Sequence, residues 1–338
     1  MIVFRLNAGP QVGFGHLTRC RALAYALREQ GESCIMVGPD HAYANDEDDR
    51  LFDAWIPQVW DSAENDASLL VMFARSYNAK KIVLDDYRVN EAYQLVLRNE
   101  GIKWLQFEAR TTQPIWADIV LNANPSAKPE DYAAVLRNPE TQLLLGPRYA
   151  VLRPEFTNIK NRAHRDQIKK VLVTFGGGDD RGAILFVLVS LIPATSKDLH
   201  FIVVSGANNP RNQEIKNWIR LYGQGRVIMK INPPSVASIF ADCDLAIMAG
   251  GTATYEAACC GLPMLLMTIA DNQHSQAKAW ADIGAAKLVG NYKNIEGSDL
   301  ANAMIELVAD NRTCKEMGDN GKMNVSSLGA FYVIERFF

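Results

Sequence analysis

The sequence has no long apolar run and no leader-like start. No run reaches the ~18 apolar residues that a membrane-spanning helix requires, and Ile2–Leu6 has the character of a strand rather than of a basic start before a long apolar stretch. We therefore expect no membrane span and a cytoplasmic protein.

An excess of charge of one sign is also missing. The chain has 35 Lys and Arg against 38 Asp and Glu, a formal net charge of −3, and it contains no basic run. Proteins that bind nucleic acid usually carry a Lys/Arg stripe, so we predict that nucleic acid is not a partner. A small anionic ligand is compatible with this balance, because a few placed amides and cations can bind it. The sequence does not fix the oligomeric state, and a monomer is favoured.

Paired cysteines and metal-binding patterns are absent as well. None of the six cysteines forms a C-x-x-C pair, and the adjacent Cys259 and Cys260 suit neither a simple disulfide nor a zinc knuckle. We expect small buried apolar side chains in a reducing cytosol. No carboxylate cluster has convincing metal spacing, so we expect no metal and no cofactor.

What the sequence does contain is a repeated alternation of strands and helices. At ~150 residues per domain, 338 residues indicate two domains. Short apolar runs predict strands, and segments with apolar residues at helical spacing lie between them, as in Leu17–Gln30. This order predicts an α/β fold with parallel sheets covered on both faces. The predicted strands are 2–6, 33–37, 81–84, 104–107, 119–121, 170–174, 199–204, 226–230, 244–248 and 264–267.

The polar stretch Pro154–Gln167 predicts the linker between two Rossmann-like domains. The expected division is an N-terminal domain over 1–153, a linker over 154–167, a C-terminal domain over 168–325 and a tail over 326–338. Whether the apolar tail packs on the first domain stays open. The acidic segment Asn45–Arg50 predicts an exposed loop.

The first glycine-rich turn follows the first predicted strand and contains Gly13, Gly15 and His16. In open parallel sheets, ligands bind beyond the carboxyl ends of strands, and glycine lets the backbone approach a ligand closely. His16 would start the next helix, whose partial positive charge favours a neutral imidazole. A neutral imidazole can accept a proton as a general base. The alternative is a histidine that only caps or packs.

Two further glycine turns lie in the second half. Phe175–Asp179 contains three consecutive glycines, among them Gly177, and forms either a loop close to a ligand or a flexible turn. Ala249–Glu256 follows the buried strand Asp244–Met248 and opens an apolar helix. Its Gly250, Gly251 and Thr252 amides would face an anion such as a diphosphate.

Polar residues near this third turn complete the candidate site. Glu256, one turn into the helix, would accept hydrogen bonds from a ribose diol, or would simply favour the positive helix end. Asn272 and Gln273, in the loop Ala270–His274, could meet a sugar or phosphate. His274 is a weaker catalytic candidate than His16, because a histidine at a helix start often only packs or is solvated.

Taken together, these motifs resemble a known family. The Gly-Gly-Thr-x-x-x-Glu turn (250–256), Gly-Leu-Pro (261–263) and Asp-Asn-Gln (271–273) resemble the nucleotide-binding half of MurG-type GT-B glycosyltransferases. Within that superfamily, the chain is most similar to the UDP-2,4-diacetamido-2,4,6-trideoxy-β-L-altropyranose hydrolases of pseudaminic acid biosynthesis. The further motifs that carry this resemblance lie at 12–16 with Arg19, and at 84–87, 121–125, 145–156 and 174–179.

The resemblance implies a GT-B-like fold, in which two Rossmann-like domains face an interdomain cleft that holds the UDP-sugar. It implies hydrolysis to UDP and free sugar by attack of water at the anomeric carbon with inversion, without a metal, in a pathway that serves flagellin glycosylation. In this family His16 would be the base, Tyr87 and Asn272 would orient water or substrate, and Arg19 belongs to the matching motif and would contact substrate. One departure is Gly178 where the family often has threonine, so one ligand hydrogen bond is lost.

Two other functions fit the same motifs. A UDP-sugar-dependent glycosyltransferase of surface polysaccharide synthesis would use the same cleft with a bound acceptor in place of water. A non-catalytic nucleotide-sugar binding protein would bind UDP without turnover. Hydrolase and transferase share a fold, so the fold cannot choose between them.

Overall fold

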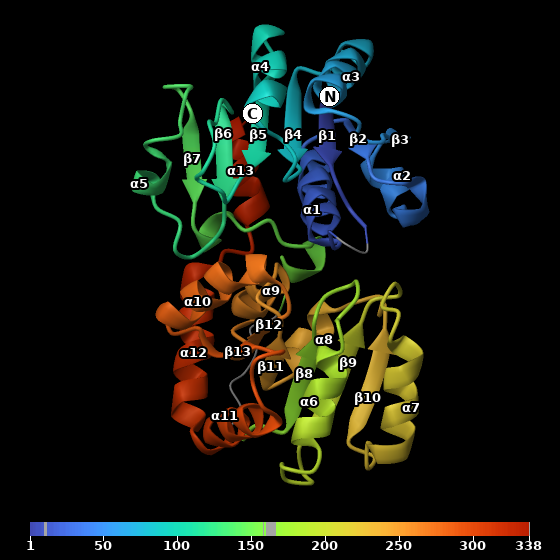
Figure 1. Ribbon diagram of the computed structural model, residues 1–338, viewed down its shortest axis with the longest axis vertical. Helices are drawn as coiled ribbons and strands as arrows, with labels where there is room; N and C mark the ends of the chain where they lie inside the picture. Colours follow the sequence, from blue (N-terminus) through green and yellow to red (C-terminus); the bar gives the residue numbers. More distant parts are fainter. Residues whose placement is uncertain (10–11, 158, 160–166, 338) are drawn as a thin grey trace. The chain divides into compact units, whose positions relative to one another are not determined.

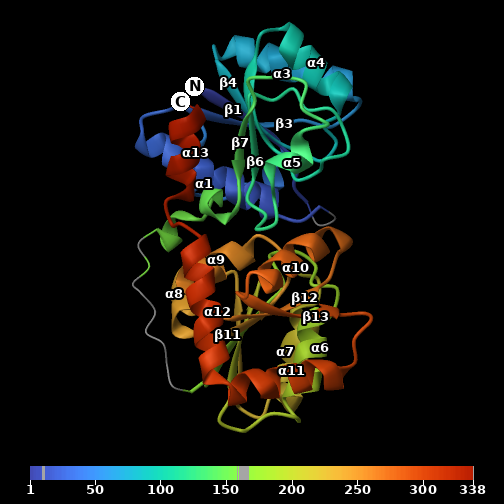
Figure 2. The ribbon, with the colours of Figure 1, turned by 90° about the vertical axis from the view of Figure 1, so that its left-hand side faces the viewer.

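The computed structural model describes residues 1–9, 12–157, 159 and 167–337, which divide into two compact units (Figures 1 and 2). The first unit consists of Met1–Pro154 together with Leu328–Phe338, and the second of Glu155–Ser327. Each unit is an α/β structure built on one parallel sheet.

The first unit contains a seven-stranded parallel sheet in the order β3-β2-β1-β4-β5-β6-β7. Its strands are β1 (Ile2–Leu6), β2 (Cys34–Gly38), β3 (Ala54–Pro57), β4 (Lys81–Asp85), β5 (Lys103–Phe107), β6 (Ile119–Asn122) and β7 (Gln142–Leu145). Its helices are α1 (Gly15–Glu29), α2 (Asp48–Leu51), α3 (Ala63–Ser76), α4 (Glu91–Asn99), α5 (Pro129–Tyr132) and α13 (Gly329–Phe337), with short 3-10 turns η1 (His41–Tyr43) and η2 (Pro147–Tyr149).

Alternate residues of these strands enter two separate cores. Phe4 of β1 packs on one face, which α1 and α13 cover. Val3 packs on the other face, which α3 and α4 cover. Because side chains alternate along a strand, neighbouring residues at a strand end also face opposite sides of the sheet.

The last helix completes the first of these cores. Val333, Ile334 and Phe337 of α13 are buried in the same cluster as Leu23 and Leu27 of α1. Figure 2 shows α13 beside α1. The C-terminal end of the chain is therefore part of the first unit.

The second unit contains a six-stranded parallel sheet in the order β10-β9-β8-β11-β12-β13. Its strands are β8 (Lys170–Thr174), β9 (His200–Ser205), β10 (Val227–Ile231), β11 (Leu245–Met248), β12 (Met264–Thr268) and β13 (Ala286–Asn291). Its helices are α6 (Ala183–Leu191), α7 (Asn212–Tyr222), α8 (Ala237–Asp242), α9 (Ala253–Cys260), α10 (His274–Asp282), α11 (Gly297–Ala309) and α12 (Asn311–Asn324). Two 3-10 turns, η3 (Pro154–Phe156) and η4 (Asp271–Gln273), join these elements.

The helices of the second unit also lie on both faces of its sheet. One core joins strand residues such as Val173 and Ile247 to α6, α7 and α11. On the other face α9 contacts α8 and α12 (Figure 1).

Each sheet has one switch point, where successive strands stop being added on one side of the first strand and begin to be added on its other side. In the first unit β1 is followed outward by β2 and β3 on one side, whereas β4 to β7 continue on the other. In the second unit the same reversal lies between β8 and β11. Loops that leave the carboxyl ends of strands at such a switch point separate and leave room for a ligand.

The parallel α/β architecture predicted from the sequence is confirmed, but three edge or near-edge strands were not expected. β3, β7 and β13 lie at sheet edges, and most of their residues are only partly buried, unlike the residues of a central strand. The prediction of an exposed loop at 45–50 is wrong for its second half. There α2 begins, and Asp48 is buried because Arg21 binds its carboxylate through two nitrogens.

The predicted linker lies largely outside the described residues. Pro154 belongs to the first unit, and the next two residues belong to the second. Phe156 is buried edge-on against Phe240, and Glu155 accepts hydrogen bonds at the start of α8. Throughout the part of the chain that the structure describes, no helix has the length and apolar character to cross a membrane.

Candidate functional site

The first group of predicted site residues gathers at the switch point of the first unit. Gly13 has a φ of +90° and exchanges backbone hydrogen bonds with Gly9, which closes the loop between β1 and α1. Residues 10 and 11 of this loop lie outside the described residues. Gly15 is the first residue of α1, so His16 stands in its first turn.

His16 points at the end of the neighbouring strand. Its Nδ1 lies 2.6 Å from Oδ1 of Asp85, the last residue of β4, and 3.2 Å from Nη2 of Arg19. The shorter contact fits an Nδ1 proton donated to the Asp85 carboxylate, and in the neutral ring with that tautomer Nε2 carries the lone pair. His16 is only 5% exposed.

Asp85 is held as a carboxylate by its surroundings. Burial would raise the pKa of its carboxyl group, but the Arg19 guanidinium and the His16 ring beside it lower that pKa well below its usual range. Arg19 binds both oxygens of Asp85, with Nε 2.5 Å from Oδ2, and lies over the ring of Phe107. Arg19 was predicted to contact substrate; in this structure its guanidinium holds Asp85.

Tyr87 lies on the other side of the His16 ring. The two rings meet edge to face, with centroids 4.7 Å apart and planes at 80°. Tyr87 is 45% exposed. The structure thus brings together two of the residues predicted to be catalytic, His16 and Tyr87, and the predicted substrate-binding residue Arg19, and it adds Asp85.

The second group gathers at the switch point of the second unit. Gly177 belongs to the loop after β8, and Gly250, Gly251 and Thr252 form the turn between β11 and α9. These two strands are neighbours. The Gly177 loop rests on the loop after β9, because a Cβ at Gly206 would lie only 2.0 Å from the Gly177 carbonyl oxygen.

The turn between β11 and α9 is fixed from α10. Thr254 is fully buried, and its hydroxyl donates to the Gly251 carbonyl at 2.7 Å and accepts from Trp280 Nε1 at 2.8 Å. Gln276 Nε2 donates to the same Gly251 carbonyl at 2.8 Å. This carbonyl is therefore turned into the protein and held there by two hydrogen bonds.

The two glycines of this turn, Gly250 and Gly251, have different surroundings. A Cβ on Gly250 would lie 2.8 Å from Ala277 Cβ and 2.9 Å from the Gln273 carbonyl oxygen, whereas a Cβ on Gly251 would have no neighbour within 4 Å. Gly250 is therefore needed for contact with α10, and the open side of the turn lies at Gly251.

The remaining predicted residues flank this turn. Glu256 is in the first turn of α9 and is 6% exposed. Asn272 is exposed in η4, while Gln273 Oε1 accepts a hydrogen bond from the Ile269 amide at 3.0 Å and so closes its loop. His274 is exposed at the start of α10, as expected of a solvated helix-start histidine.

Several residues that the sequence did not single out support both groups. Asp85 lies within the Leu84–Tyr87 motif but had no predicted role. Thr254, Gln276 and Trp280 fall on ordinary helical positions, so only their contacts identify them. The nearest sequence signal was at Asp85, a carboxylate that directly ends an apolar strand.

Among the described residues, no three His, Cys, Asp or Glu side chains are grouped so that they could hold a metal ion. Five of the six cysteines are buried and Cys259 is partly buried, and none of these six described residues forms a disulfide.

This chain is similar to several known proteins. The family described as "UDP-glucoronosyl and UDP-glucosyl transferase" matches residues 245–329. The spore coat polysaccharide biosynthesis protein SpsG of Bacillus subtilis (strain 168) is 25% identical over 291 residues, which are 84% of this chain and 82% of that protein. The UDP-2,4-diacetamido-2,4,6-trideoxy-β-L-altropyranose hydrolase of Campylobacter jejuni is 21% identical over 277 residues, 82% of this chain and 94% of that protein.

Among solved structures, MurG of Acinetobacter baumannii aligns with a TM-score of 0.68 at 16% identity, over 99% of this chain and 98% of that one. This likeness, together with the two parallel sheets, shows a GT-B-like fold, as predicted. The resemblance to the altropyranose hydrolase is likewise confirmed as a low-identity similarity over most of the chain.

Proposed function

We propose that this protein is an enzyme acting on UDP-sugars. Specifically, it would hydrolyse UDP-2,4-diacetamido-2,4,6-trideoxy-β-L-altropyranose to UDP and the free sugar in pseudaminic acid biosynthesis. The observation that carries the proposal is the hydrogen bond between His16 and Asp85 at the switch point of the first unit. The similarity to the Campylobacter hydrolase supports the choice of reaction and substrate.

The first unit would supply the base. Asp85 accepts the Nδ1 proton of His16, and the lone pair of Nε2 is then available to take a proton from water. Because Arg19 keeps Asp85 ionised, the carboxylate also stabilises the imidazolium that forms when His16 accepts this proton. Tyr87, against the His16 ring, would orient the water or the sugar.

The second unit would hold UDP. Gly250, Gly251 and Thr252 precede α9. The Thr254 and Tyr255 amides already donate to the carbonyls of Gly251 and Thr252, so the amides of Gly251 and Thr252, at the positive end of the helix, would face an anion such as a diphosphate. Glu256 would accept hydrogen bonds from the ribose hydroxyls. Gly177, Asn272 and Gln273 would add contacts to the phosphates or the sugar.

The reaction itself would be a single displacement. The water oxygen forms a bond to the anomeric carbon while the bond from that carbon to the β-phosphate oxygen breaks, and its electron pair leaves with UDP. The water proton goes to His16 Nε2. Attack from the face opposite the leaving group inverts the anomeric configuration. In this scheme backbone amides and side chains hold the diphosphate, and no metal is required.

A UDP-sugar-dependent glycosyltransferase is the second candidate. It is favoured by the match of residues 245–329 to a transferase family, a segment that includes the turn before α9. In that case an acceptor hydroxyl would replace water, with His16 as the same base.

Product analysis in H₂¹⁸O tests these alternatives. Incubation with the UDP-diacetamido sugar is expected to release UDP and to place ¹⁸O in the free sugar. His16→Gln is expected to abolish this release, whereas His200→Gln, at the amino end of β9 and away from the strand carboxyl ends, should retain it. Release of UDP only after an acceptor is added would favour the transferase. Tight UDP binding without turnover of any sugar would make the protein a non-catalytic binder, and ¹⁸O in UDP would contradict attack at carbon.

A further inference from the structure

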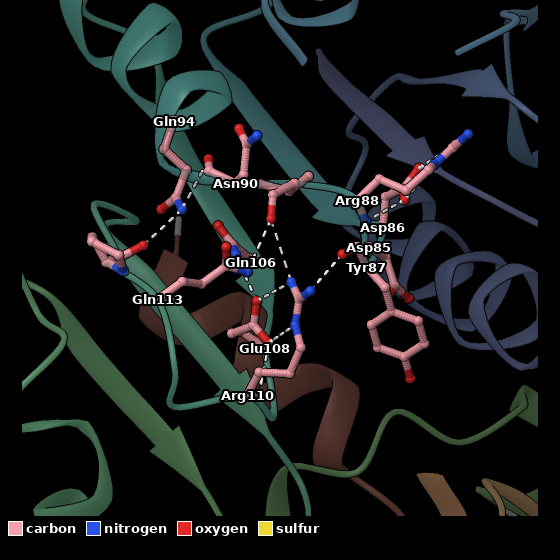
Figure 3. Close-up of polar contacts among 12 residues, drawn as sticks. Asp85, Asp86, Tyr87, Arg88, Asn90, Gln94, Gln106, Glu108, Arg110 and Gln113 are labelled. Atoms are coloured by element: carbon pink, nitrogen blue, oxygen red, sulfur yellow. Dashed lines mark hydrogen bonds and ion pairs between the residues drawn. The ribbon is translucent and has the colours of Figure 1, made fainter. Parts of the chain in front are cut away.

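Tyr87 stands against His16 on a loop that is held from a neighbouring loop. This loop follows β4, and Tyr87 is nearly half exposed, so contacts of its own side chain with the core do not fix it. What fixes it is the loop after β5, whose polar side chains reach across to the loop's backbone (Figure 3).

Arg110 is the residue that makes this connection. Its Nη1 donates to the Tyr87 carbonyl oxygen and its Nη2 to the Val89 carbonyl oxygen at 3.4 Å. Its guanidinium also lies 5.7 Å from the centre of the Tyr87 ring. Gln113 donates to the same Val89 carbonyl at 3.1 Å. One guanidinium therefore contacts both the backbone and the ring of Tyr87.

Arg110 is itself held in place by Glu108. The two side chains form a two-point ion pair, with Nε 2.9 Å from Oε1 and Nη2 2.8 Å from Oε2, and the Arg110 amide donates to Oε1 at 2.8 Å. Glu108 is 2% exposed and also accepts from Gln106, which in turn accepts from Trp104 Nε1. A two-point pair fixes the plane of the guanidinium as well as its position.

The buried Glu108 has no role in the proposed chemistry. Burying a carboxylate costs free energy unless it is paired. The partner of Glu108 is Arg110, which also donates to the carbonyl oxygen of Tyr87, the residue that contacts the His16 ring.

We propose that Arg110, fixed by Glu108, is a positioning residue that holds Tyr87 against the His16 ring. This inference rests on the proposed function, since it assigns Tyr87 and His16 to the reaction. Arg110 acts through Tyr87, so its loss changes the geometry at His16 without removing either group.

The test uses the full chain with Arg110→Met, which keeps the apolar stem, and the double variant Arg110→Met/Glu108→Gln, which leaves no unpaired buried charge. The matched control is Arg75→Met with Glu100→Gln, another Arg–Glu ion pair of the same unit, which lies at the exposed carboxyl end of α3. Circular dichroism confirms that each variant folds.

The first readout does not depend on activity. In protein labelled with ¹³C and ¹⁵N at histidine, the ring-proton signal of His16, assigned by its loss in His16→Gln, is shifted by the ring current of Tyr87. Both Arg110 variants are expected to move this signal toward its position in Tyr87→Ala, and the Arg75 control is expected to leave it in place. A His16 signal unchanged in the folded Arg110 variants would overturn the proposal.

The second readout is kinetic. Loss of correct placement is expected to lower kcat by up to about 100-fold with a smaller change in KM, and the Arg110→Met effect should vanish in the Tyr87→Ala background. Additive effects of the two substitutions would show that Arg110 does not act through Tyr87. If the NMR signal moves but no UDP-sugar is turned over by the wild-type protein, the proposed function has failed while the positioning role stands.

Discussion

Two adjacent carboxylates at the end of β4 face opposite sides of the first unit's sheet. Asp85 points to the α1 face, where Arg19 and His16 bind it. Asp86 points to the α3 face, where Arg88 binds it and Arg5 lies 3.8 Å away. The alternation of side chains along a strand separates the two charges. Asp85 therefore holds His16, which contacts the Tyr87 ring, and Asp86 holds Arg88, which follows Tyr87 in the chain.

Asp85→Asn is the substitution that tests the His16 pairing most directly. An Asn amide donates to Nδ1 and so moves the ring proton to Nε2, where it blocks a general base. We expect kcat to fall by up to about 10⁴-fold, the scale seen when the same change is made in a Ser-His-Asp triad, with UDP affinity retained. Steady-state kinetics and calorimetric titration with UDP measure the two effects.

The control for this prediction is Asp53→Asn, which removes another Asp–Arg pair of the first unit, formed with Arg28. It should leave kcat within about 3-fold of wild type, because surface pairs contribute little. An Asp85→Asn enzyme that is as active as the control would show that His16 does not need its carboxylate partner.

At the scale of elements, the turn between β11 and α9 combines a packed side and an open side. Gly250 faces α10 and Gly251 faces open space. The hydroxyl of Thr254 and the side-chain amide of Gln276 both donate hydrogen bonds to the Gly251 carbonyl. Substitutions at Gly250 and at Gly251 therefore alter the packed side and the open side of the turn separately.

Gly250→Ala and Gly251→Ala are expected to separate stability from binding. The added methyl group at Gly250 meets Ala277 and a backbone carbonyl, so we expect a loss of about 1–3 kcal/mol in the free energy of unfolding. At Gly251 the methyl group meets nothing, and stability should change by less than about 0.5 kcal/mol. UDP affinity should nevertheless fall, because the methyl group occupies the side from which a diphosphate would approach.

Chemical denaturation and calorimetric titration with UDP check this pair of variants. Unchanged UDP affinity in a stable Gly251→Ala protein would remove this turn from the proposed diphosphate site.

Some strands and site residues could be predicted from the sequence, and others could not. Central strands such as β1 and β11 are rich in apolar residues and fully buried, and they were predicted nearly to the residue. The edge strands were not predicted: β3 is a short segment that ends in proline, and Lys287 and Gly290 interrupt the apolar residues of β13. His16 could be found because glycines flank it. Its partner Asp85 could not be assigned, because the pairing depends on β4 lying beside β1, and strand order is a property of the whole sheet.

At the scale of the whole molecule, the chain builds the first unit, then the second, and returns to the first with α13. The second unit is thus one continuous segment, Glu155–Ser327. The first unit is discontinuous, because part of one of its cores comes from the last ten residues or so of the chain. The sequence did not predict where α13 packs, because the apolar residues of a helix do not show which part of the protein covers them.

This difference predicts unequal behaviour of the two units when they are produced separately. Residues 155–327 should fold alone and bind UDP, because their sheet and both of its faces come from one segment. Residues 1–154 should be unstable alone, since without α13 the side chains packed by Val333, Ile334 and Phe337 are uncovered. Burial of three such side chains contributes several kcal/mol, at about 1.5–3 kcal/mol each, which is a large part of the about 5–15 kcal/mol that stabilises a domain.

Joining residues 328–338 to residue 154 through a flexible linker supplies the decisive comparison. The fusion should recover a cooperative thermal transition that residues 1–154 lack, and Val333→Asp in the fusion should abolish it again, because a charge cannot be buried in that core without a partner. Calorimetry and protection from proteolysis measure both outcomes. If residues 1–154 alone melt as cooperatively as the fusion, α13 covers the first unit without stabilising it, and the return of the chain must serve another purpose than completing the core.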